Sequence, residues 1–156
     1  MKKLVFLFMV IRASITLQAQ SPYDSITISR CSIAMEYFEH AEKLPDILKA
    51  GKFSNYISRE KTIWIEPTGN TEQIKFDVPL LVDNIQKNGT QDVSRCFIPR
   101  HSINFYKEGK ITRCLLVCFQ CDGFHFSDDS ANAFVKNVET REKQMAQLKE
   151  IFKELL

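Results

Sequence analysis

The clearest periodic pattern lies at the C-terminus, where apolar residues recur at intervals of three and four positions. This spacing predicts an amphipathic helix that starts at a cap formed by Asp128, Asp129 or Ser130. Its apolar positions are Phe134, Val138, Met145, Leu148, Phe152 and Leu155. We expect these side chains to pack on the protein's own sheet, and a helix that docks into a partner's groove is the alternative.

Two further segments have helical character. Helical spacing from Ser29 to Gly51 predicts one helix or two short ones, because Pro45 interrupts the segment and Gly51 is a stop signal. Its apolar positions are Ile33, Met35, Phe38, Leu44 and Leu48. A shorter apolar run, Leu80 to Gln86, predicts a short helix.

Alternation of apolar and polar residues predicts strands elsewhere. Lys61 to Glu66 alternates around Trp64 and is followed by a turn sequence, and Gln73 to Val78 predicts a second strand that Pro79 ends. Gly123 to Ser127 also alternates, which places His125 on the face opposite its two phenylalanine neighbours.

A β-hairpin is predicted around Glu108 and Gly109, which form its two-residue turn. Lys107 then pairs with Lys110 at the turn, and the same register applies along both strands. It pairs Tyr106 with Ile111, Ile103 with Cys114, His101 with Leu116, and Cys96 with Cys121. A one-residue bulge would shift every pair beyond it.

This register divides the side chains of the hairpin between two faces. One face contains His101, Ile103, Phe105, Cys114, Leu116 and Cys118. The other contains Leu115, Val117, Phe119 and Cys121. Because both faces of the second strand are apolar, we expect that strand to be central in its sheet and covered on both sides.

The N-terminus reads as a secretory signal peptide covering residues 1–20. Lys2 and Lys3 precede an apolar run from Leu4 to Ile11, and small residues follow. Arg12 leaves this run far short of the roughly 20 apolar residues of a membrane-spanning helix. We therefore expect a secreted or periplasmic protein with no membrane span after signal cleavage.

Removal of this leader changes the charge balance. The formal net charge of +2 falls to −1 when Lys2, Lys3 and Arg12 are lost. Nucleic-acid affinity rests on lysines and arginines that neutralise phosphates, so we expect no nucleic-acid partner. The remaining residues, 21–156, have the size of a single domain and contain no repeat or linker.

Cysteines dominate the candidate chemistry, and an exported protein uses them by default in disulfides. We expect Cys96 to bond Cys121, which lies directly opposite in the predicted ladder, with Cys118 as the other possible partner. Since the chain has five cysteines, at least one is left over. Cys31 or Cys114 fits that role, because both lie in apolar patterns typical of buried, inert thiols.

Two chemical alternatives use the same residues. Cys96, His101, Cys118 and Cys121 form a possible zinc ligand set, and Cys118 with His101 forms a possible nucleophilic pair beside Arg100. Cys118 and Cys121 have the spacing of a zinc knuckle, but in a continuous strand their side chains point to opposite faces. A hydrogen-bonded histidine that anchors the hairpin is the simpler interpretation of His101.

The segment from Cys96 to Cys121 resembles an uncharacterised family of small exported bacterial proteins, similar to those of Bacteroidetes. The shared pattern is Cys-Phe-x-Pro-Arg-His followed by Cys-Phe-x-Cys. In this chain its residues are Cys96, Phe97, Pro99, Arg100, His101, Cys118, Phe119 and Cys121. The resemblance implies export and an important hairpin, and it implies no particular activity.

The sequence therefore predicts one α+β domain, in which an antiparallel sheet contains the cysteine-bearing hairpin. Its strands are expected at 101–106, 111–120 and 123–127, covered by an N-terminal and a C-terminal helix. The function expected is non-enzymatic binding of another macromolecule or an envelope component, with the hairpin as a disulfide-stapled element. We expect no cofactor.

Overall fold

The computed structural model describes residues 21–32, 52–65, 77–91, 97–127, 132–135 and 137–156. Within these ranges the fold is α+β, as predicted, with a seven-stranded sheet in the order β2-β1-β4-β5-β6-β7-β3. Every neighbouring pair of strands is antiparallel. The strands are β1 (Ser25–Cys31), β2 (Ile57–Ile65), β3 (Gly89–Gln91), β4 (His101–Lys107), β5 (Lys110–Cys118), β6 (Gly123–Phe126) and β7 (Asn132–Val135).

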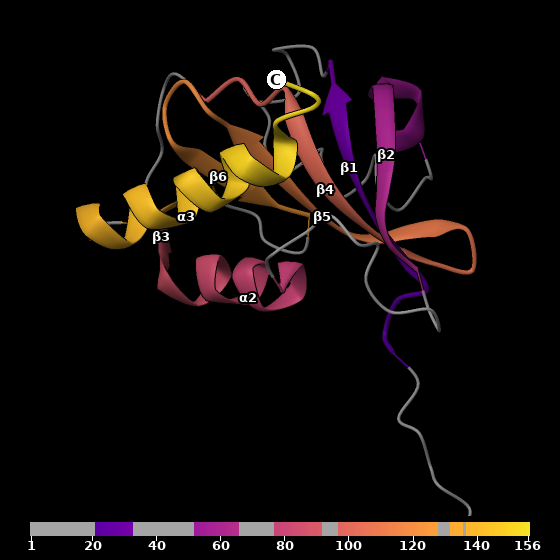
Figure 1. The fold of residues 1–156 in the computed structure, drawn as a ribbon, viewed down its shortest axis with the longest axis horizontal. Helices are drawn as coiled ribbons and strands as arrows, with labels where there is room; N and C mark the ends of the chain where they lie inside the picture. Colours follow the sequence, from indigo (N-terminus) through magenta and orange to yellow (C-terminus); the bar gives the residue numbers. More distant parts are fainter. Residues whose placement is uncertain (1–20, 33–51, 66–76, 92–96, 128–131, 136) are drawn as a thin grey trace, which may run out of the picture.

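The described residues contain two α-helices, α2 (Val78–Asn88) and α3 (Val138–Phe152), and a short 3-10 helix, η2 (Phe53–Tyr56). Figure 1 shows α2 and α3 on the same side of the sheet. Both contribute to one apolar cluster with residues of β1, β4, β5 and β6. No helix among the described residues is long and apolar enough to span a membrane.

The β4–β5 hairpin forms at the predicted turn. Glu108 and Gly109 have φ values of 50° and 72°, and two-residue hairpin turns of type I′ require positive φ at both central positions. Gly109 adopts this conformation without steric cost, whereas a residue with a side chain is strained there. The predicted pairs Lys107 with Lys110 and Tyr106 with Ile111 are confirmed.

Beyond these two pairs the predicted register is wrong, because a bulge lies between Phe105 and Tyr106. Thr112 is the extra residue, and its hydroxyl donates to the carbonyl of Phe105 at 3.2 Å. After the bulge Ile103 pairs with Leu115 and His101 pairs with Val117. A shift of one residue moves every later side chain of one strand to the other face.

The predicted division of faces is consequently wrong as well. Ile103 and Phe105 share the helix-covered face with Leu115 and Val117. The opposite face carries a second cluster of Cys31, Phe53, Phe97, Cys114, Leu116 and Cys118. The central position of β5 is confirmed, since it lies between β4 and β6 and its residues from Cys114 to Cys118 are buried on both faces.

The predicted helix from Ser29 to Gly51 is wrong at its start, because Ser29–Cys31 belong to β1. Its remainder, 33–51, lies outside the described residues. The predicted strand Lys61 to Glu66 is confirmed as the second half of β2 up to Ile65. Of the predicted strand Gln73 to Val78, only the end is described, and Val78 is the first residue of α2.

The short helix predicted at 80–86 is confirmed as part of α2, which begins earlier because Asp77 caps it. The Asp77 side chain accepts the N–H of Leu80 at 3.0 Å, and Pro79 is tolerated in the first helical turn.

The C-terminal helix is shorter than predicted. Asn137 caps α3 by accepting the N–H of Thr140 at 2.8 Å, whereas Asp128, Asp129 and Ser130 lie outside the described residues. Phe134 belongs to β7, and Val138 is exposed. The predicted packing on the protein's own sheet is confirmed for Met145, Leu148 and Phe152.

Candidate functional site

The end of β5 differs from the predicted long strand. β5 stops at Cys118, and residues 119–122 form a turn that leads into β6. Asp122 has a φ of 50°, and a Cβ atom added at Gly123 would lie 2.8 Å from the Phe97 ring. The close approach of the Phe97 ring therefore leaves no room for a side chain at position 123 unless that ring shifts.

This turn overturns the argument that separated Cys118 from Cys121. Phe119 packs toward the helix-covered core, while Cys121 packs against the cluster that contains Cys118. The two cysteines consequently lie on one side, and the Cys121 side chain hydrogen-bonds the sulfur of Cys118. Their arrangement has the spacing and the turn of a zinc knuckle.

Several donors converge on the Cys118 sulfur. The backbone N–H groups of Ile98, Cys121 and Gln120 all bond to it, in addition to the Cys121 thiol. Burial alone would raise the pKa of Cys118, but these hydrogen bonds outweigh burial and lower that pKa below its ordinary value. These donors therefore stabilise the thiolate form of Cys118 more than that of an ordinary cysteine.

The other two described cysteines have the opposite character. Burial raises the pKa of Cys31 to about 12 and raises that of the fully buried Cys114 well above its ordinary value. Both are free thiols in the structure, as is Cys118. The predicted disulfide cannot be placed, because Cys96 lies outside the described residues, and its pairing with Cys121 or Cys118 stays a prediction.

His101 packs in the helix-covered core. Its ring contacts those of Phe119 and Phe152 edge to face, at centroid distances of 5.0 and 5.3 Å. The imidazole donates to the backbone carbonyl of Leu155, and its Nε2 atom is buried without a partner among the described residues. Burial lowers the pKa of His101, and the positive charges of Arg30 and Arg100 lower it further.

The structure does not bring His101 to Cys118. His101 faces the helices, whereas Cys118 belongs to the cluster on the opposite face of the sheet. Neither the nucleophilic pair nor the zinc set with His101 is therefore assembled. Among the described residues, no three side chains of histidine, cysteine, aspartate or glutamate gather closely enough to hold a metal ion.

Pro99 and Arg100 line a pocket of about 320 Å³ next to the Cys118 turn. Ile98 of the same segment also lines it, and the remaining lining residues come from β1, its end and β2: Arg30, Cys31, Ser32 and Ser58. The N–H of Cys31 donates to the carbonyl of Arg100 at 2.8 Å, which fixes the arginine-bearing segment against β1. We call this cavity the arginine pocket.

Arg30 of the arginine pocket also faces a like charge on β2, outside the lining of the pocket. Arg30 pairs directly with Arg59 of β2, and like charges placed opposite each other in a sheet are destabilising. Arg30, Arg59 and Arg100 are all exposed, and none forms a salt bridge with a described residue. Sequence reasoning singled out Arg100 but missed Arg30 and Arg59, because only the pairing of β1 with β2 brings them together.

Comparisons of this chain with protein-family models, with curated proteins and with solved structures find no match to any of them.

Proposed function

We propose that this is an exported, non-enzymatic binding protein that recognises an anionic group on a macromolecule or another envelope component. The arginine pocket is the recognition site. The observation that carries the proposal is the convergence of Arg30 and Arg100 on one cavity, without a carboxylate partner among the described residues.

The chemistry of the pocket favours phosphate or carboxylate groups. A guanidinium group presents several N–H donors in one plane, and it binds both kinds of oxyanion through paired hydrogen bonds. Ser32 lines the same cavity with a hydroxyl group that can donate to an oxyanion, whereas the Ser58 hydroxyl already donates to the backbone carbonyl of Arg30 at 3.1 Å. A bound anion would also relieve the repulsion between Arg30 and Arg59.

The proposal is tested by calorimetric titration with inorganic pyrophosphate and with citrate, as phosphate and carboxylate probes. Hydrogen bonds to charged groups contribute about 1.5–3 kcal/mol, so Arg30→Ala or Arg100→Ala should weaken binding by about tenfold or more. The affinity of the wild-type protein should fall as the salt concentration rises.

Lys110→Ala is the matched control, because it removes the same charge at the far turn of the hairpin. It should leave the affinity unchanged. Failure of both probes to bind, or an equal loss of affinity in Lys110→Ala, would show that the pocket is not a specific anion site.

A second candidate function is supported by the donors around Cys118. N–H groups that bond to a cysteine sulfur stabilise the thiolate, and the thiolate is the form that coordinates zinc and other thiophilic metals. Cys118 and Cys121 would supply two ligands. Protein purified from its native compartment should then contain stoichiometric zinc that Cys118→Ser removes, and metal-free wild-type protein would exclude this candidate.

A further inference from the structure

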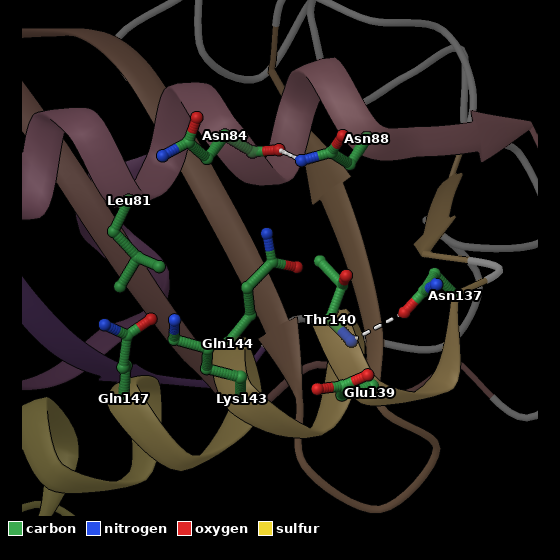
Figure 2. Close-up of a pocket in the computed structure, with 9 residues that line it drawn as sticks. All are labelled: Leu81, Asn84, Asn88, Asn137, Glu139, Thr140, Lys143, Gln144 and Gln147. Carbon is green, nitrogen blue, oxygen red and sulfur yellow. Dashed lines mark hydrogen bonds between the residues drawn. The ribbon is translucent and has the colours of Figure 1, made fainter.

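We infer that a second ligand site, separate from the arginine pocket, lies between α2 and α3 and accepts an uncharged polyhydroxyl ligand such as a saccharide. The cavity has a volume of about 460 Å³, within the range of about 300–1,000 Å³ that is typical of small-molecule pockets. It shares no lining residue with the arginine pocket. Figure 2 shows its walls, formed by one face of each helix.

The inference rests chiefly on the buried carboxamide of Gln144. It lies one turn before Leu148 and two turns before Ile151, on the buried face of α3, where an apolar residue is expected. Only 4% of Gln144 is exposed, and its Oε1 atom has no hydrogen-bond partner among the described residues. Buried polar atoms in folded proteins nearly always have a partner, so this oxygen calls for a donor from outside the fold.

The side chain of Gln144 points from α3 into the cavity toward α2, as Figure 2 shows. Four more carboxamides line the same space. Two of them already form hydrogen bonds with the backbone. Asn137 caps α3, and the Asn88 side chain donates to the backbone carbonyl of Asn84 at 2.8 Å. The carboxamides of Asn84 and Gln147 line the cavity beside Gln144 and form no such bond to a described residue.

These groups define the class of ligand. A carboxamide offers both donors and an acceptor, as a sugar hydroxyl does, so amides and hydroxyls can pair in either direction. The charged residues of the wall, Glu139 and Lys143, are exposed and of opposite sign, so the cavity favours neither anions nor cations. Leu81 supplies an apolar surface for the C–H face of a sugar ring.

The experiment is a two-dimensional NMR titration of the whole protein, read on the side-chain amide signals of Asn84, Gln144 and Gln147. The probes are glucose, galactose, mannose and N-acetylglucosamine, at concentrations up to tens of millimolar. We expect at least one of them to shift these signals in a saturable way and to raise the unfolding temperature.

Gln144→Leu removes the unpartnered oxygen and keeps a side chain of similar size. The loss of a neutral hydrogen bond should weaken binding of the same sugar by about fivefold or more. Ala146→Leu is the control, because it adds a leucine at an exposed position of α3 and should bind like the wild type.

Three results would overturn the inference. The first is that no sugar shifts the amide signals, in which case Gln144 binds a buried water only. The second is that Gln144→Leu binds the sugar as tightly as the wild type does. The third is that Ala146→Leu loses as much affinity as Gln144→Leu. Because Gln144→Leu removes an unsatisfied buried atom, we expect it to fold at least as stably as the wild type, so loss of binding cannot be ascribed to unfolding.

Discussion

Among single residues, the partners of a side chain decide whether it can act in chemistry. Cys118 and Cys114 are both buried on the same face of β5, yet their pKa values shift in opposite directions. The difference comes first from the Cys121 thiol and then from the backbone N–H groups around Cys118, one of which belongs to Ile98, twenty positions away. No local sequence pattern reveals such a donor, whereas the apolar surroundings of Cys114 are visible in its neighbours.

His101 leads to a prediction about pH. Its pKa in the folded protein lies below the ordinary value of about 6.5, chiefly because of burial. The unfolded chain therefore takes up a proton at a higher pH than the folded protein does. Stability should fall as the pH drops below about 6.5, because protonation favours the unfolded state.

The measurement is the urea midpoint of wild-type protein and of His101→Gln at pH 7.5 and at pH 5.5. The wild type should lose more stability on acidification than the variant, which cannot take up this proton. His125, also buried, is present in both proteins, so the difference between them reports on His101 alone. Parallel losses in the two proteins would contradict a depressed pKa at His101.

Among the secondary-structure elements, the sequence predicted those whose two faces differ clearly in polarity. The hairpin turn, β6 and most of α3 were found in this way. β1 was missed because its second face is polar and still buried: Thr27 and Ser29 both bond to the Asn104 side chain of β4. Polar residues that satisfy each other inside a fold look like surface residues in a sequence.

The bulge between Phe105 and Tyr106 was also not predictable from the sequence. The turn residues fix the register at their own end of the hairpin, and the first two pairs were predicted correctly. One extra residue, Thr112, then inverts the faces, and nothing in its side chain marks it in advance. The candidate zinc set and the nucleophilic pair with His101 both depended on the register that this bulge breaks.

A prediction about α3 follows from its packing. Phe152 is fully buried and contacts the rings of Phe119 and His101. Phe152→Ala should therefore destabilise the protein by about 3–5 kcal/mol. Lys149→Ala, on the exposed side of the same helix, should change the stability by less than about 0.5 kcal/mol. Both values are obtained from denaturant unfolding, and a stable Phe152→Ala protein would show that α3 is dispensable for the core.

For the molecule as a whole, the α+β class was predictable, but the sites were not. The arginine pocket is formed by β1, β2 and the segment before β4. The cavity that contains Gln144 is formed by α2, α3 and the cap of α3. Each needs segments that are distant in the sequence and whose separate patterns carry no sign of one another. The segment 97–101, which the sequence pattern singled out, contributes Pro99 and Arg100 to the arginine pocket and His101 to the helix-covered core.

Export is the property of the whole molecule that these proposals require, and it predicts where the mature chain begins. Cleavage after Ala19 or Gln20 leaves the first described contacts intact, since the Ser21 carbonyl accepts from Lys107 and Tyr23 packs on Trp64 and Phe105. The cleaved protein should therefore keep the same fold. Fractionation of the native cells, followed by intact-mass measurement, should find a chain starting at Gln20 or Ser21 outside the cytoplasm. A full-length product starting at Met1 in the cytoplasm would contradict export, and an envelope ligand for the arginine pocket would then be excluded.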